Sequence, residues 1–326
     1  MNNETGRGVV CARRDFLRRT SCLAAAAAAS GLGMLTGPQA VAASKTPDRI
    51  VVMDWPLTET LLALGVVPVG VSAPDWYRRV IVEPPLPSNV VNVGLLYSPN
   101  YDVLDELAPD LMIITPGHAP ARALLERLAP TLTLGRYTSS AQPYPALRAE
   151  TMQMAQAVGR RDAGKNVLER TDSVLAEARA RLARRAERLR RPVIVADLID
   201  DRHLRVYGAG SLFDAMMSTI GVTNVIGPSG GASAWPTGSG GFAVVSMQRL
   251  FELPQASLLL TGDIRPSQRA ALAQSAIWQA LPSMTSRCAA VLPVVAPNGG
   301  LISMQRFALG VEQALTQIAE GGGGLG

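Results

Sequence analysis

The chain has 326 residues, of which 17% are charged and 48% are hydrophobic, and its formal net charge is +5. This length supports one large or two medium domains, and most of the positive charge lies in residues 1–43, so basicity is no argument for a nucleic-acid partner. One cysteine beyond residue 43, Cys288, excludes an intramolecular disulfide there, and two histidines argue against a multi-histidine metal centre.

The first segment predicts a signal for export through the twin-arginine pathway. Arg13 and Arg14 precede an apolar dipeptide and then a weakly hydrophobic, Ala-rich run over residues 22–34. That run is too short and glycine-interrupted to span a membrane, and residues 40–43 suit a leader peptidase. We therefore expect residues 1–43 to be removed and the mature protein to lie in the periplasm. The residues before Cys22 lack the apolar side chain of a lipoprotein signal, so no lipid anchor is expected.

The segment after the signal alternates short apolar runs with stretches of helical spacing. Strands are predicted over residues 49–53, 66–71 and 111–114, because each is a short apolar run. Helices are predicted over residues 56–64, which begins with a proline and is followed by a glycine, and over 100–107, which a proline stops. Strands that alternate with helices of about ten residues indicate a parallel α/β sheet.

Residues 164–189 predict one long helix. Apolar side chains recur every three or four positions, and arginines fill the other faces. No proline or glycine follows Gly164 in this run, so we expect a helix of about 25 residues. We interpret the basic face as a solvated surface, and a membrane or partner patch is the alternative.

The second half of the chain repeats part of the first. Residues 212–222 resemble residues 57–66, and the segment that leads into the apolar run 258–260 resembles the one that leads into 111–114. Two lobes built on the same plan explain this echo. Chance similarity of short apolar patterns is the alternative.

Several longer segments occur in a specific order and spacing. They include Pro47–Val51, Leu61–Gly70, Glu83–Pro87, Leu107–Leu111, Leu198–His203 and Trp278–Pro282. Together, over nearly all of residues 48–315, they resemble the periplasmic iron-siderophore binding proteins of ABC importers. Within that family the resemblance is greatest to the proteins that bind ferric hydroxamates.

The resemblance implies an α/β fold of the helical-backbone type (class III), with two parallel-sheet lobes joined by a single long helix. We expect the N-terminal lobe over residues 44–158, the linking helix over 159–191, the C-terminal lobe over 192–320 and a disordered tail over 321–326. The implied function is iron transport. A monomer would capture a ferric siderophore in the cleft between the lobes and deliver it to an inner-membrane ABC permease and its ATPase.

Loops that follow strands in both halves carry side chains suited to such a ligand. They are Trp55, Tyr97, His118, Trp235 and Asn298. Because the siderophore already fills the coordination sphere of the iron, the pocket needs aromatic walls and a few donors rather than metal ligands. Trp235 lies in a Gly-rich loop with little apolar company, which favours ligand contact over burial. Leu198, in one of the matching segments, completes the set.

The resemblance carries over to some of these positions and fails at others. Trp55 and Trp235 match residues that line the family's pocket. Leu96 stands where the family has an arginine, His118 stands where it has a tyrosine, and Asn298 ends the stretch that replaces an aromatic triplet. Loss of the arginine forfeits a charge-assisted hydrogen bond of about 1.5–3 kcal/mol to the chelate. A differently shaped or less anionic chelate is therefore an alternative to a hydroxamate.

The resemblance also implies two docking carboxylates, because family members use one per lobe to contact arginines of the permease. The aligned positions here are Ala123 and Gln248. Nearby Glu126 and Glu252 are the candidates to replace them. The alternative for each is an ordinary exposed charge.

Two other functions compete with siderophore binding. A protein of the same fold could bind haem or cobalamin, with Tyr97 or His118 as an axial ligand for haem. An exported α/β enzyme is the second alternative, but no Gly-x-Ser-x-Gly elbow between a strand and a helix is evident. We therefore expect no catalytic residues, no cofactor, no metal held by the protein's own side chains and no nucleic-acid partner.

Overall fold

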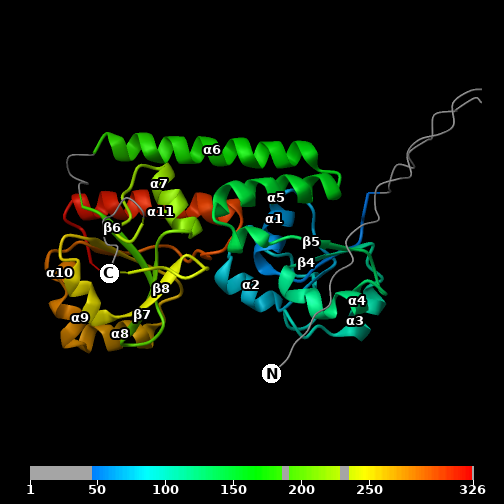
Figure 1. The fold of residues 1–326 in the computed structure, drawn as a ribbon, viewed down its shortest axis with the longest axis horizontal. Helices are drawn as coiled ribbons and strands as arrows, with labels where there is room; N and C mark the ends of the chain where they lie inside the picture. Colours follow the sequence, from blue (N-terminus) through cyan, green and yellow to red (C-terminus); the bar gives the residue numbers. More distant parts are fainter. Residues whose placement is uncertain (1–45, 186–190, 228–234, 325–326) are drawn as a thin grey trace, which may run out of the picture. The chain divides into compact units, whose positions relative to one another are not determined.

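The computed structural model describes residues 46–185, 191–227 and 235–324 (Figure 1). The predicted export signal over residues 1–43 lies outside these residues. Within the described ranges, every helix is too short or too polar to cross a membrane.

Five parallel strands form the first sheet, in the order β3-β2-β1-β4-β5. The strands are β1 (Ile50–Val52), β2 (Gly70–Val71), β3 (Val91–Asn92), β4 (Leu111–Ile114) and β5 (Thr131–Thr133). The helices between and after them are α1 (Trp55–Ala63), α2 (Pro74–Val80), α3 (Tyr101–Leu107), η1 (Pro116–Ala121), α4 (Arg122–Leu125), η2 (Arg136–Ser139) and α5 (Pro143–Ala157). The three strands and two helices expected in this half are present, and the predicted parallel sheet is confirmed.

Strand β2 is shorter than the predicted run over residues 66–71. The N–H of Val66 donates to the carbonyl of Leu61 at 3.2 Å, so Val66 closes the end of α1 instead of starting a strand. Pro68 has no N–H to offer a neighbouring strand. Hydrogen bonding to β1 therefore begins only at Val69, whose N–H donates to the carbonyl of Ile50 at 2.8 Å, and the paired register begins at Gly70.

Helix α6 (Arg161–Ala183) corresponds to the long helix predicted over residues 164–189. Gly164 lies inside this helix rather than at its start. A Cβ at this position would stand 2.7 Å from the Cβ of Ala155 in α5. The glycine thus lets α5 and α6 pack closely. Figure 1 shows α6 running past α5 at one end and past α7 and α11 at the other, so it bridges the two halves. Predicted helix residues 186–189 lie outside the described part of the chain.

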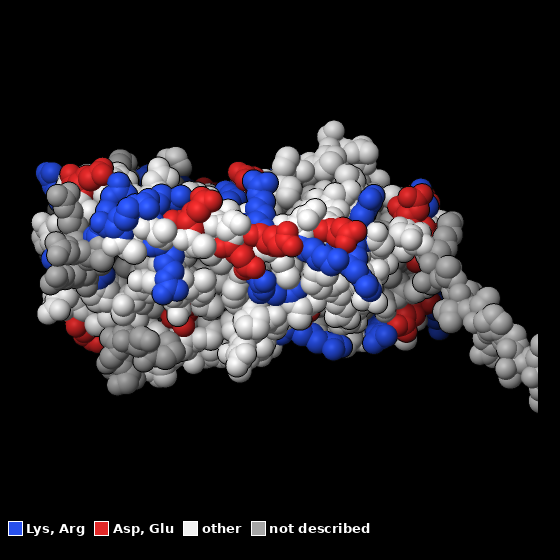
Figure 2. Space-filling view, turned by 90° about the horizontal axis from the view of Figure 1, so that it is seen from above, with Lys and Arg blue, Asp and Glu red and all other residues white. Residues whose placement is uncertain are grey.

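The outer face of α6 carries charges of both signs. Figure 2 looks onto this face and shows basic and acidic side chains interspersed along it. Several form ion pairs with neighbours, among them Arg148–Asp172 at 2.5 Å and Arg181–Glu312 at 3.3 Å. This mixture is typical of a solvated helix surface, as the sequence predicts, and it is unlike a basic membrane patch.

The second sheet has five strands in the order β10-β9-β6-β7-β8 and is mixed. Its elements are β6 (Val193–Leu198), β7 (His203–Tyr207), α7 (Leu212–Thr219), β8 (Phe242–Ser246), η3 (Met247–Glu252), β9 (Ser257–Thr261), α8 (Pro266–Gln274), α9 (Ala276–Ala280), α10 (Pro282–Thr285), β10 (Ala289–Val291) and α11 (Leu301–Ala319). Strands β10, β9 and β6 are parallel, whereas β6, β7 and β8 form an antiparallel meander.

The meander departs from the expectation that both sheets are parallel throughout. Four residues separate β6 from β7, too few for the crossover that a parallel connection needs. The Asp200 carboxylate instead accepts the N–H groups of Arg202 and His203 at 2.8 and 2.7 Å, which closes a tight turn. A hairpin follows directly from this turn.

The echo between the two halves reflects a shared plan. Helices α1 and α7 are each followed by a glycine with positive φ, Gly65 at 74° and Gly221 at 79°. Strand β1 pairs in parallel with β2 and β4, and β6 correspondingly pairs with β9 and makes a parallel bridge between Val193 and Asn224. In each lobe a central strand is thus followed by a helix that leads back to a segment parallel to that strand, with β7 inserted before the helix in the second lobe.

Contacts beyond α6 also join the lobes. The rings of Phe213 and Phe307 stack 4.0 Å apart in a core cluster that also contains Tyr137 and Leu147 of the first half. The buried carboxylate of Glu59 in α1 accepts hydrogen bonds from the amides of Gly300 and Ser303 at the start of α11. A shared core cluster and a buried polar contact thus join the two lobes.

Candidate ligand-binding cleft

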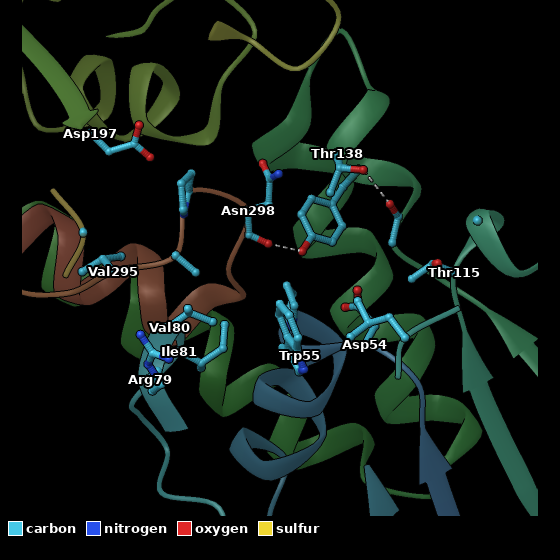
Figure 3. Close-up of a pocket in the computed structure, with 18 of the residues that line it drawn as sticks. Asp54, Trp55, Arg79, Val80, Ile81, Thr115, Thr138, Asp197, Val295 and Asn298 are labelled. Atoms are coloured by element: carbon cyan, nitrogen blue, oxygen red, sulfur yellow. Dashed lines mark hydrogen bonds between the residues drawn. The ribbon is translucent and has the colours of Figure 1, made fainter. Parts of the chain in front are cut away.

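A cleft of about 620 Å³ lies between the two sheets. The first lobe contributes residues after β1, β4 and β5, the end of α2 and the loop before α3. The second contributes Asp197 of β6, Arg205 of β7, residues after β9 and the segment before α11. Ligands of parallel α/β sheets bind at the carboxyl ends of strands, and these segments lie there. Figure 3 shows Asp54, Trp55 and Thr115 facing the cavity from the first lobe and Asp197 and Val295 from the second.

Trp55 forms part of an aromatic wall. It is the first residue of α1, and its indole N–H donates to the carbonyl of Ser72 at 2.9 Å. Its ring stacks on Trp76 at 6.0 Å, and the guanidinium of Arg79 lies 5.0 Å from the Trp76 ring. The wall is therefore held rigidly from behind, which suits binding of a large apolar ligand surface.

Leu96 and Tyr97 line the cleft, whereas His118 supports them from beneath. His118 is 2% exposed. Its Nδ1 accepts the N–H of Thr115 at 3.1 Å, which leaves the proton on Nε2, and Nε2 donates to the carbonyl of Leu96 at 2.6 Å. His118 therefore positions the Leu96–Tyr97 loop and does not itself line the cavity, unlike the expectation from its loop position.

Asn298 lines the cleft from the second lobe and contacts Tyr137, a residue that the sequence analysis does not single out. The hydroxyl of buried Tyr137 donates to the carbonyl of Asn298 at 2.6 Å (Figure 3). Tyr137 follows β5, a strand absent from the sequence prediction. Recognition of that strand would have placed Tyr137 at the same sheet edge as Trp55.

Trp235 and Leu198 lie away from the cavity. Trp235 is 3% exposed and packs in a core cluster with Val225, Ile226 and Met247. Its indole N–H donates to Glu252 at 2.9 Å. The premise that this tryptophan has too little apolar company is wrong, because its neighbours come from other segments. Leu198 is partly buried against the same cluster.

Comparison with known proteins places this cleft in a family. Residues 50–287 match the model of the periplasmic binding protein family. The chain belongs to that family. Members of the family are solute-binding proteins rather than enzymes.

Relatives of this family member include siderophore-binding proteins. The chain is 30% identical to the iron(3+)-hydroxamate-binding protein FhuD of Escherichia coli over 274 residues, which covers 84% of this chain and 89% of FhuD. The crystal structure of Fe³⁺-Desferal-bound FhuD from Vibrio cholerae is similar, with a TM-score of 0.74, 21% identity and coverage of 83% of this chain and 98% of that one. The petrobactin-binding protein YclQ from Bacillus subtilis has a TM-score of 0.63 at 20% identity, with 83% and 93% coverage. The predicted two-lobe, helix-linked fold is confirmed.

Charged groups of the cleft form a set that sequence reasoning did not anticipate. The lining contains three carboxylates, Asp54, Asp197 and Asp263, and two guanidinium groups, Arg79 and Arg205. Burial raises the pKa of Asp54 to about 6, against the lowering effect of its N-cap hydrogen bond from Leu57. Arg79 and Asp263 approach from opposite lobes to 3.9 Å. The binding protein therefore offers a mixed lining without an excess of positive charge.

The two candidate docking carboxylates are both engaged in local contacts. Glu126 accepts hydrogen bonds from Arg122 at 2.7 Å and from Thr131 at 2.9 Å. Glu252 pairs with Arg249 at 3.0 Å, in addition to its bond from Trp235. These pairs hold the pKa of both glutamates below the ordinary value, so both are ionised near neutral pH. Their use in docking stays a prediction.

Proposed function

We propose that this periplasmic binding protein captures a ferric siderophore of the hydroxamate type and delivers it to an ABC permease with its ATPase. The observation that carries the proposal is the cleft, which combines a stacked aromatic wall with few charged donors. A tris-hydroxamate complex of Fe(III) is neutral at its core, whereas a tris-catecholate complex carries three negative charges. A lining with more carboxylates than guanidinium groups favours the neutral core.

Haem binding has less support from the residues of the cleft. Both ring nitrogens of His118 are engaged in hydrogen bonds, so the imidazole has no free nitrogen for iron. Tyr97 remains as an axial candidate, with 67% of its surface exposed. Haem is therefore a comparison ligand in the test below.

Titration of the intrinsic tryptophan fluorescence tests the proposed ligand class. Ferric hydroxamates should quench the fluorescence saturably at lower concentrations than ferric catecholates, ferric citrate, haem or cobalamin, because Trp55 lines the cavity and Trp76 stacks on it. The Ga(III) complex of the same hydroxamate, which has the same shape, should compete with the iron complex. Tight binding of a catecholate or of haem with no response to hydroxamates would refute the proposal.

Export by the twin-arginine pathway is a separate part of the proposal. Replacement of both Arg13 and Arg14 by lysine should abolish accumulation in the periplasmic fraction, because the arginine pair precedes a weakly apolar run. The matched change of Arg18 and Arg19 to lysine should leave export intact. Undiminished export of the first variant would show that another pathway serves this chain.

A further inference from the structure

A row of polar side chains crosses the second sheet at the wall of the cleft. Asp197 at the end of β6 lies opposite Thr261 of β9 on one side and opposite Arg205 of β7 on the other. Residues paired in this way point to the same face of a sheet. Asp197 and Arg205 both line the cavity, and Figure 3 shows Asp197 across the cavity from Asp54 and Thr115.

Each member of this row has a buried polar atom with no partner among the described residues. These atoms are Asp197 Oδ1, Arg205 Nε and Thr261 Oγ1. Thr261 is only 2% exposed. The other carboxylate oxygen, Asp197 Oδ2, accepts the hydroxyl of Tyr207 at 2.9 Å and a long bond from Arg205 at 3.4 Å. Unpaired buried polar groups are costly and rare in native folds. Asp197 and Arg205 line the cavity, and Thr261 lies beside Asp197 in the sheet, so the three unpaired atoms point to a ligand group that satisfies them.

The charged side chains of the second lobe indicate which kind of ligand group this part of the cleft binds. Arg205 is also spread over the ring of Phe242, 5.1 Å away, and so gives Asp197 only that one long contact. Asp263, two residues beyond Thr261, adds a second carboxylate that is 57% exposed and lies 3.9 Å from Arg79 of the first lobe. The second lobe therefore presents two carboxylates and one guanidinium to the cavity. A cation is the complement of such a wall.

We propose that the row Asp197–Thr261–Arg205 is a subsite for a protonated amine arm of the bound chelate. The ammonium donates to Asp197 Oδ1 and Thr261 Oγ1, and Arg205 Nε donates to an acceptor oxygen of the same ligand. This assignment rests on the proposed function and narrows it to ferric hydroxamates that carry a primary amine.

Two ferric hydroxamates that differ only in the positive charge of one amine arm test the proposed subsite. Ferrioxamine B carries a terminal ammonium group, and its N-acetyl derivative has the same iron core without the charge. The wild-type protein should bind ferrioxamine B about tenfold more tightly than the N-acetyl form, the scale of one charge-assisted hydrogen bond. In Asp197→Asn this preference should fall to about one, because asparagine keeps the shape of the side chain and removes its charge.

A control and a second variant keep the result interpretable. Asp201→Asn, an exposed position on the neighbouring turn, should retain the full preference. Thr261→Val keeps the shape of the side chain and should reduce the preference about threefold, which gives an answer even if Asp197→Asn folds poorly. Equal affinity of the wild type for both chelates, or a preference that survives in Asp197→Asn, would overturn the subsite while hydroxamate binding stands. Failure of both chelates to bind would refute the hydroxamate proposal itself.

Discussion

Replacement of Glu59 by alanine should lower the free energy of unfolding by about 3–5 kcal/mol at neutral pH. Glu59 is fully buried in α1, and its carboxylate accepts bonds from Gly300 N at 2.9 Å, Ser303 N at 2.7 Å and Ser303 Oγ at 2.7 Å. The N-cap residue of α11, Gly300, has no side chain of its own to cap the helix, so Glu59 supplies the cap from the other lobe. Alanine would leave three buried donors without a partner.

Denaturation in urea measures this effect, and a matched exposed glutamate controls for it. Glu106→Ala, on the surface of α3, should change the free energy of unfolding by no more than about 0.5 kcal/mol. Equal stability of Glu59→Ala and Glu106→Ala would contradict the role of Glu59 as the cap of α11. Such a result would mean that the start of α11 finds other acceptors when the carboxylate is gone.

The same residue should give stability a distinct pH dependence. Burial raises the pKa of Glu59 from its ordinary 4.5 to about 7, although the bonds from Ser303 and Gly300 and the charge of Arg306 oppose the rise. Between these two values the folded protein holds a proton that the unfolded chain releases, so the free energy of unfolding falls as pH rises. The advantage of wild type over Glu59→Gln should therefore shrink from about pH 4.5 to about pH 7. The carboxyl group of Asp54 also titrates within this pH range, but wild type and Glu59→Gln both contain it, so it does not affect the difference between them. An advantage that grows with pH would contradict the raised pKa.

Local patterns in the sequence were enough to predict the main helices and strands of the fold. The spacing of apolar residues located α1, α3 and most of α6, because a buried helix face needs a side chain every three or four positions. The position of Trp55 directly after a predicted strand placed it at the ligand edge of the sheet. The signal for Asp54 is also local, since an aspartate before Trp55-Pro56 is an N-cap pattern.

The failures concern residues whose neighbours lie far along the chain. The sequence places His118 in the cleft. Its role is instead to hold the carbonyl of Leu96, and no spacing rule connects these two residues. The Gly-rich loop around Trp235 predicts an exposed side chain, whereas Ile226 and Met247 from other segments bury it. The polar row of Asp197, Thr261 and Arg205 exists only once three strands are placed in register. Such features follow from tertiary packing, which overrides the composition of any one segment.

Introduction of an arginine at position 96 should change ligand affinity by about 10- to 100-fold, equivalent to about 1.5–3 kcal/mol. Leu96 lines the cleft, and the bond from His118 to its carbonyl fixes the loop, so a new side chain there would point toward the ligand. If the natural ligand is a ferric hydroxamate, Leu96→Arg should tighten binding through a charge-assisted hydrogen bond to the chelate oxygens. Titrations of this variant and of wild type with the same ferric hydroxamate measure the effect.

The neighbouring residue provides the control for position 96. Leu95 is 63% exposed and does not line the cavity, so Leu95→Arg adds the same charge to the same loop and should leave affinity unchanged. If the natural ligand is a different chelate, Leu96→Arg should weaken its binding, because the guanidinium would be buried without a partner. Equal and negligible effects of both arginine variants on every chelate would mean that residue 96 does not contact the ligand. A tighter hydroxamate complex in Leu96→Arg alone would show that a donor at this position of the first lobe reaches the chelate oxygens, a contact that the wild-type leucine cannot make.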